Sequence, residues 1–229
     1  MSRMFAIDGK PMKTWNPFKG CLFQCTYCWA RDLAEGKLSH LDKYCDGFFP
    51  AFHERELRRK FKPGQFVAVS LMGDVYWAKP EWRDAILERI LQFPDTNFLF
   101  QSKAPVIFNL ADWPKLENIY YGTTIETNRD HGMTSAPKPY YRYMCFTSLS
   151  HAHKLVSIEP ICDFDLEVMV KWMREIKPEI IEIGADNYHN NLPEPPWWKV
   201  AQLLKELREI CPNVVEKEGL ERLKWKLLR

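Results

Sequence analysis

Residues 14–30 read Thr14-Trp-Asn-Pro-Phe-Lys-Gly-Cys21-Leu-Phe-Gln-Cys25-Thr-Tyr-Cys28-Trp-Ala30, which places three cysteines in one short loop. Thiolates spaced by three and then two residues can converge on one cubane iron–sulfur cluster. A [4Fe–4S] cluster held by only three thiolates leaves one of its irons open to another ligand. The spacing therefore predicts that Cys21, Cys25 and Cys28 hold such a cluster.

A structural zinc site is the alternative for the same cysteines. Zinc would need a fourth ligand, for which Cys45 or His40 is available. Cys45 lies far beyond Cys28 with no paired spacing, and the chain contains no second C-x-x-C pair. These spacings favour the iron–sulfur prediction over zinc.

The composition is that of an ordinary soluble, globular chain. Of 229 residues, 46% are hydrophobic and 27% are charged, which argues against disorder. The formal net charge of +2 excludes a strong overall field for nucleic acid or anionic membranes, although local basic patches stay open.

Two features of the sequence bear on where the protein resides. Residues 1–20 contain no apolar signal-peptide core, and no apolar run approaches membrane-spanning length. Seven cysteines, three of them crowded together, favour metal ligands in a reducing compartment over a disulfide framework. We therefore expect a cytoplasmic protein with no membrane partner.

Short β-type runs alternate with helical ones along the chain. Runs rich in β-branched or aromatic residues predict strands at 13–16, 66–72, 97–101, 119–125, 154–161 and 180–184. Apolar stripes at helical spacing predict helices at 81–92, 165–176 and 196–210.

This alternation predicts an α/β fold with parallel strands. Eight β/α units would need roughly 250 residues, so six units favour a partial (β/α)6 TIM-like barrel over a closed barrel. A doubly wound open sheet is the alternative. We expect a single domain over 1–229, with its core at about 13–190 and a C-terminal helical closing segment at 195–229. In either fold, functional groups gather at the carboxyl ends of the strands.

The C-x-x-x-C-x-x-C spacing, with the aromatic Tyr27 before its last cysteine, resembles the cluster loop of the radical SAM superfamily. The string TWNPFKGC…CTYCWA, together with Ser157-Ile-Glu-Pro160, resembles a phage and archaeal branch of that superfamily. This branch is distantly similar to spore photoproduct lyase. The superfamily resemblance covers about residues 14–184.

The resemblance implies two cofactors, a [4Fe–4S] cluster and S-adenosyl-L-methionine. In the superfamily, the open iron binds the amino and carboxylate groups of S-adenosylmethionine. Electron transfer then gives methionine and a 5′-deoxyadenosyl radical, which abstracts a hydrogen atom from the substrate. The reductant would be a protein such as ferredoxin or flavodoxin, and the barrel would supply binding, orientation and exclusion of water.

The resemblance also assigns residues to S-adenosylmethionine. Tyr27 would pack near its adenine. Met72-Gly73-Asp74 stands where the superfamily has a Gly-Gly-Glu-like segment that binds the amino group, with the first glycine absent and Asp replacing Glu. Asp74 is still a suitable acceptor for an ammonium group, and its alternative is an acid at a helix N-terminus. Glu126 or Asn128, after the fourth strand, matches the ribose-binding position.

Other polar residues are candidates from their place at strand ends. Lys103 would meet the cofactor carboxylate or a substrate phosphate, or lie at the surface. Ser157 and Glu159 share one face of the fifth strand, and we expect Ser157 to bind the cofactor. A carboxylate in an apolar strand is costly unless it is paired or functional, so Glu159 is a catalytic candidate with a buried salt bridge as the alternative. The polar residues 185–191 stand where either a substrate-contacting loop or a solvent-facing loop would lie.

Cys162, just after the fifth strand, is the other catalytic candidate. A thiol near the radical could return a hydrogen atom to the product, as a cysteine does in spore photoproduct lyase. The alternative role for an isolated cysteine is that of a small buried hydrophobic residue.

Two classes of function stay open at this point. The first is a radical S-adenosylmethionine enzyme that abstracts hydrogen from a nucleic-acid, nucleotide or peptide substrate. The second is an iron–sulfur or zinc module that binds nucleic acid without radical chemistry. A degenerate barrel that binds S-adenosylmethionine without forming a radical is a third option.

Overall fold

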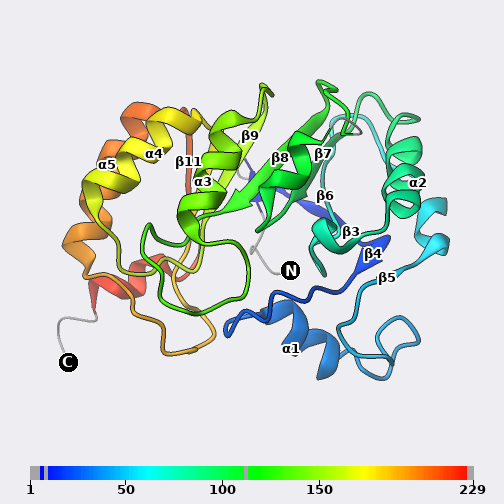
Figure 1. Ribbon diagram of the computed structural model, residues 1–229, viewed down its shortest axis with the longest axis horizontal. Coiled ribbons are helices and arrows are strands. Elements are labelled where there is room, and N and C mark those ends of the chain that lie inside the picture. Colours follow the sequence, from blue (N-terminus) through cyan, green and yellow to red (C-terminus); the bar gives the residue numbers. More distant parts are fainter. Residues whose placement is uncertain (1–5, 8–9, 111–112, 226–229) are drawn as a thin grey trace.

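A parallel sheet forms the centre of the computed structural model, which describes residues 6–7, 10–110 and 113–225 (Figure 1). The strand order is β11-β10-β9-β8-β7-β6-β3, and every neighbouring pair is parallel. The strands are β3 (Lys13–Trp15), β6 (Phe66–Val69), β7 (Asn97–Gln101), β8 (Ile119–Thr124), β9 (Lys154–Ile158), β10 (Ile180–Ile183) and β11 (Asn213–Glu216).

The spatial order of these strands follows their order along the chain without a reversal. A doubly wound sheet would contain such a reversal at its switch point. The sheet instead curls into a half barrel (Figure 1). The prediction of a partial, TIM-like α/β barrel is therefore confirmed, and the doubly wound alternative is wrong.

The six predicted strands are present, and β11 is a seventh that the sequence analysis missed. It lies within 195–229, a segment expected to be helical. Helix α5 (Trp197–Ile210) occupies part of that segment, and a 3₁₀ helix follows at Leu220–Lys224. Helix α5 thus returns the chain to the sheet, where β11 pairs with β10.

Helices pack on the outside of the half barrel (Figure 1). These are α2 (Pro80–Ile90), α3 (Pro139–Ser148), α4 (Leu166–Ile176) and α5. Proline occupies the first helical turn of α2 and α3, where its missing N–H costs nothing. The main apolar core lies between these helices and the sheet, and it contains Val69, Phe100, Ile158, Met173 and Leu203.

The inner face of the sheet changes character along the strands. Near their amino ends it is apolar, with Ala68, Leu99, Leu155 and Ile180 packed in one cluster. Two residues further along β7, β9 and β10, the same face presents Gln101, Ser157 and Glu182. Alternation therefore places polar side chains at the carboxyl ends of the strands.

Smaller elements surround the cysteine loop. Strand β4 (Phe18–Lys19) pairs with β5 (Ala51–Phe52), and α1 (Trp29–Glu35) follows the last loop cysteine. Strands β1 (Ala6–Ile7) and β2 (Lys10–Pro11) form a separate antiparallel pair. Further 3₁₀ helices span Glu54–Arg58, Val75–Trp77 and Pro105–Asn109. Among the residues placed by the structure, no helix has both the length and the apolar character needed to cross a bilayer.

Candidate functional site

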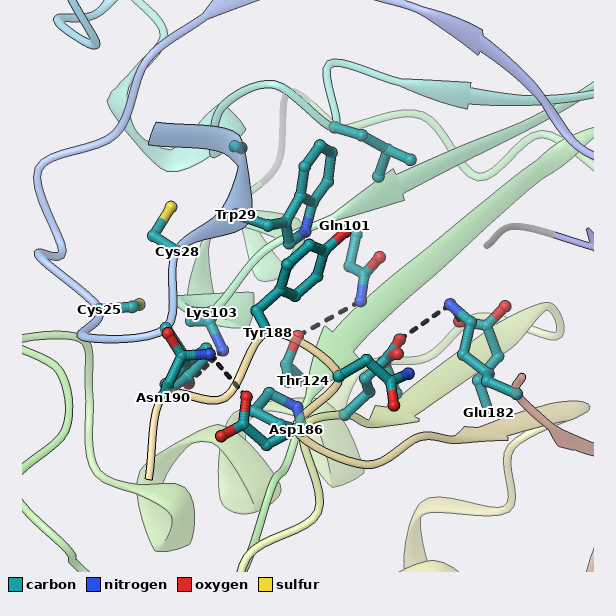
Figure 2. Close-up of a pocket in the computed structure, with 18 of the residues that line it drawn as sticks. Cys25, Cys28, Trp29, Gln101, Lys103, Thr124, Glu182, Asp186, Tyr188 and Asn190 are labelled. Atoms are coloured by element: carbon teal, nitrogen blue, oxygen red, sulfur yellow. Dashed lines mark hydrogen bonds and ion pairs between the residues drawn. The ribbon is translucent and has the colours of Figure 1, made fainter. Parts of the chain in front are cut away.

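A cavity of about 620 Å³ opens at the carboxyl ends of the strands (Figure 2). One side, here called the cysteine wall, consists of Cys21, Cys25, Tyr27 and Cys28. Another side, here called the acidic wall, consists of Glu159, Glu182 and Lys217. The cavity is also lined by Trp29, Gly73, Asp74, Gln101, Ser102, Lys103, Thr124, Ser157, Asp186, Asn187, Tyr188 and Asn190.

The cysteine wall is joined to the end of β6 by direct backbone contact. The Gly20 N–H donates to the Met72 carbonyl at 2.8 Å, and the Asp74 N–H donates to the Gly20 carbonyl at 3.2 Å. A Cβ atom on Gly73 would lie 2.7 Å from the Gly20 nitrogen. Gly20 itself has a φ of +92°, a conformation that favours glycine. The two glycines therefore set the position of the loop that follows.

Polar groups face each of the three loop thiols. The Phe23 N–H donates to the Cys21 Sγ at 3.4 Å, and the Arg31 N–H donates to the Cys28 Sγ at 3.4 Å, which makes Cys28 the N-cap of α1. The Cys25 Sγ lies 3.1 Å from the Thr134 hydroxyl. Such hydrogen bonds tune cluster thiolates. Burial raises the pKa of the Cys21 and Cys28 thiols, so binding a metal cluster there must displace protons.

The donor set on the cysteine wall fits a [4Fe–4S] cluster, which takes cysteine thiolates as ligands. All three loop cysteines are free thiols on one cavity wall. Within the described parts of the chain, no three His, Cys, Asp or Glu side chains gather as closely as one metal ion requires. A cubane cluster distributes three thiolates over three irons, so its ligands need not meet at one point. Cys45 and His40, the candidate fourth zinc ligands, are exposed and absent from the cavity lining.

Asp74 lines the cavity and also caps a helix. Its carboxylate accepts hydrogen bonds from the Tyr76 N–H at 3.0 Å, the Ser102 hydroxyl at 2.6 Å and the Lys103 N–H at 2.8 Å. Burial raises the pKa of this carboxyl, although these three donors oppose the shift. A carboxylate can accept about four hydrogen bonds, so one position is left for a ligand in the cavity. Both roles expected for Asp74 are thus compatible with its placement.

Glu126 is buried behind the cysteine wall and does not line the cavity. Strand β8 ends at Thr124, which does line the cavity, so the alternation expected to carry Glu126 to the same face stops two residues before Glu126. The Glu126 carboxylate instead accepts from the Tyr27 hydroxyl, pairs with the Lys103 ammonium, and pairs with the Arg142 guanidinium at 2.6 Å. Burial opposes its ionisation, but Arg142 and Lys103 prevail and lower the pKa of Glu126.

Asn128 and Cys162 also lie outside the cavity lining. The Asn128 side chain accepts from the Asp165 N–H at 2.7 Å and donates to the Asp165 carboxylate at 2.9 Å, at the start of α4. Cys162 is fully buried, with its Sγ 3.7 Å from the Met133 Sδ. Burial raises the pKa of this thiol to about 12. In this placement, Cys162 packs behind the loop cysteines.

The acidic wall brings Glu159 together with two residues that sequence reasoning missed. The Lys217 ammonium lies 2.9 Å from the Glu159 carboxylate and 3.4 Å from the Glu182 carboxylate. Ser157 and Glu159 both line the cavity, as their shared strand face predicts. Glu182, like Glu159, is a carboxylate within an apolar strand, so the same sequence argument could have identified it. Lys217 follows the unpredicted β11 and carries no such signal.

The polar loop after β10 contacts the same cavity. Asp186, Asn187, Tyr188 and Asn190 all line it, and the Asn190 side chain donates to the Asp186 carboxylate at 2.6 Å (Figure 2). Residues 185–191 were expected to lie either beside a substrate site or facing solvent. The loop lies beside the cavity.

The structure is a parallel α/β half barrel, with three cysteines in a loop at the carboxyl edge of its sheet. No protein-family model and no curated protein matches the chain. Solved structures of spore photoproduct lyase do match it. A double mutant with bound AdoMet and dinucleoside spore photoproduct has a TM-score of 0.54 at 8% identity, covering 86% of this chain and 61% of that chain. A single mutant has a TM-score of 0.59 at 8% identity, covering 87% and 74%.

At this identity the likeness concerns the fold. The chain has a fold similar to that of spore photoproduct lyase, the protein to which the branch resembled by the cysteine loop is distantly similar. The chain spans 61% of the length of the first of these structures.

Proposed function

We propose that the protein is a radical S-adenosylmethionine enzyme that abstracts a hydrogen atom from a nucleic-acid or nucleotide substrate. The observation that carries this proposal is the position of three free thiols on one wall of a cavity at the carboxyl ends of a parallel half barrel. Cys21, Cys25 and Cys28 would hold a [4Fe–4S] cluster. When bound, the cluster and S-adenosylmethionine supply a 5′-deoxyadenosyl radical for hydrogen abstraction.

The residues beside the cysteine wall have the chemistry needed to bind the second cofactor. Asp74 has an acceptor position left for an ammonium group, and Lys103 lies in the cavity lining where a carboxylate could approach it. The Tyr27 ring contacts the Lys103 ammonium at 5.0 Å from its centroid and supports one side of this region. The inner-face groups Gln101, Thr124 and Ser157 add neutral donors and acceptors.

The choice of substrate class rests on two supports. Two neighbouring structures of the same fold hold a dinucleoside spore photoproduct, and this chain has an open cavity with aromatic and polar lining. A peptide is the other substrate class that an activity screen could identify. A cytoplasmic ferredoxin or flavodoxin would serve as the electron donor.

Anaerobic reconstitution with iron and sulfide tests the proposal. The protein should turn brown, show a [4Fe–4S] spectrum and release 5′-deoxyadenosine from S-adenosylmethionine under reduction. Pools of nucleotides, oligonucleotides and peptides then show which class stimulates the release.

Cysteine variants provide the matched controls. The triple variant Cys21→Ala, Cys25→Ala, Cys28→Ala should lose both colour and cleavage, whereas Cys45→Ala, at an exposed position outside the cavity, should keep both. Stoichiometric zinc with no cleavage would favour the nucleic-acid-binding module instead. Binding of S-adenosylmethionine without release of 5′-deoxyadenosine would favour a degenerate barrel.

A further inference from the structure

The acidic wall contains a carboxylate oxygen without a hydrogen-bond partner. The Glu182 side chain is 4% exposed, and its Oε2 faces the Lys217 ammonium at 3.4 Å. Its Oε1 is buried and, among the described residues, receives no hydrogen bond. Lys217 is shared with Glu159, so one ammonium serves two carboxylates. A buried acceptor that is left unpaired is costly, which indicates that a ligand supplies the missing donors.

The neighbouring strands extend this wall with neutral polar groups. Thr124 pairs in register with Ser157, and Ser157 pairs in register with Glu182, so the three form one row across β8, β9 and β10. The Gln101 amide donates to the Thr124 hydroxyl at 3.3 Å and continues the row onto β7 (Figure 2). All four residues line the cavity, so a bound ligand meets donors and acceptors along its floor.

Two aromatic side chains line the same cavity. Trp29 comes from α1 beside the cysteine wall, and Tyr188 comes from the loop after β10 (Figure 2). Tyr188 is 55% exposed and lines the cavity. Aromatic faces of this kind hold planar rings by stacking.

We infer that the acidic wall is a subsite for the polar edge of a nucleobase. Glu159 and Glu182 accept the base N–H groups, Lys217 donates to a ring nitrogen or carbonyl oxygen, and Tyr188 contacts the flat face. An arginine or lysine side chain offers donors to the two carboxylates but no acceptor to the Lys217 ammonium. The edge of a base carries both donors and acceptors, and so matches a wall with both signs of charge.

This inference rests on the proposed function in one respect, namely that the iron–sulfur cluster and S-adenosylmethionine bind at the cysteine wall. Nucleoside binding is nevertheless measurable apart from turnover. Isothermal titration of the reconstituted protein, with S-adenosylmethionine present, uses adenosine, guanosine, cytidine and uridine as probes, together with a short arginine-containing peptide. At least one nucleoside should bind. Glu159→Gln should weaken that binding about tenfold, and Glu182→Gln and Tyr188→Ala should each weaken it several-fold.

A matched control is available at the other end of β10. Glu179 is a carboxylate just before the strand and contacts His153 at 2.6 Å, outside the cavity. Glu179→Gln should bind the nucleoside as the unmodified protein does. The thermal unfolding midpoint of each variant, followed by circular dichroism, checks that the fold is kept. Because Tyr188→Ala changes a largely exposed side chain, it tests the subsite even if a buried substitution unfolds the protein.

Three results would overturn the subsite. They are the absence of nucleoside binding, preferential binding of the arginine peptide, and an equal loss of S-adenosylmethionine affinity in Glu159→Gln, which would assign the wall to the cofactor. Cleavage of S-adenosylmethionine without nucleoside binding would overturn the subsite alone. Glu159-dependent nucleoside binding without cleavage would support the subsite and overturn the proposed function.

Discussion

Each wall of the cavity is built on a buried carboxylate, but the two carboxylates are paired differently. Glu126, behind the cysteine wall, is met by Arg142, Lys103 and the Tyr27 hydroxyl. Glu182, in the acidic wall, shares Lys217 with Glu159 and keeps one oxygen unpartnered among the described residues. A fully paired carboxylate positions its neighbours, whereas an incompletely paired one has capacity left for a ligand. The contrast separates a supporting residue from a binding residue.

Removal of Glu126 should produce the largest loss of stability. Glu126→Ala leaves the Arg142 guanidinium, which is 1% exposed, buried without its carboxylate. We expect the free energy of unfolding to fall by about 3–5 kcal/mol, measured by urea denaturation. A loss as small as that of a surface substitution would contradict the supporting role.

The contribution of Glu126 should depend on pH. Its pKa is lower in the folded protein than in the unfolded chain, so the unfolded state binds more protons on acidification. The stability difference between the unmodified protein and Glu126→Gln should therefore be complete at neutral pH. It should shrink as the pH falls below the unfolded pKa of about 4.3. Urea denaturation between pH 7 and pH 3 checks this, and a difference that grows on acidification would contradict it.

An added methyl group at Gly73 should have an intermediate effect. In Gly73→Ala, the new Cβ would lie 2.7 Å from the Gly20 backbone. Because the contacted atoms belong to the backbone, no side-chain rotation can relieve the clash. We expect a loss of about 1–3 kcal/mol in the free energy of unfolding, together with reduced iron content after reconstitution.

Gly122→Ala is the matched control for this substitution. Its Cβ meets the Leu99 Cδ1 at 3.2 Å, and this side chain can move. A cluster content as low in Gly122→Ala as in Gly73→Ala would show that the Gly20–Gly73 contact has no special role in positioning the cysteine loop.

Neutralising Glu182 should have the smallest effect on stability. In Glu182→Gln, Lys217 keeps the Glu159 carboxylate at 2.9 Å as its partner. We expect a change of about 1 kcal/mol or less in the free energy of unfolding, measured beside Glu126→Ala in urea. Equal losses of unfolding free energy in Glu182→Gln and Glu126→Ala would contradict the distinction between a supporting and a binding carboxylate.

The sequence predicts the cysteine loop and the strand ends well because both depend on local spacing. The cysteines, Asp74, Ser157 and Glu159 all reach the cavity. Strand β11 was missed because Asn213–Glu216 is a short, half-buried edge strand with a weak apolar signal. Its absence from the prediction also concealed Lys217.

The position of Glu126 could not be read from its own strand. Its direction depends on Arg142, which α3 places beside it although no motif links the two residues. The alternation of β8 predicts side-chain direction only while the strand continues, and β8 ends two residues earlier at Thr124. Contacts between a loop after one strand and the helix that follows are tertiary, so local sequence rules do not capture them.

The backbone contact between Gly20 and Gly73 has a consequence for how the loop can vary in evolution. Leu22 and Thr26 are exposed between the cysteines, so many side chains should be acceptable there. An insertion or deletion between Gly20 and Cys28 would instead shift the thiols relative to a point fixed by main-chain hydrogen bonds at 2.8 and 3.2 Å. Related chains should therefore tolerate substitution in this loop far more readily than any change in its length.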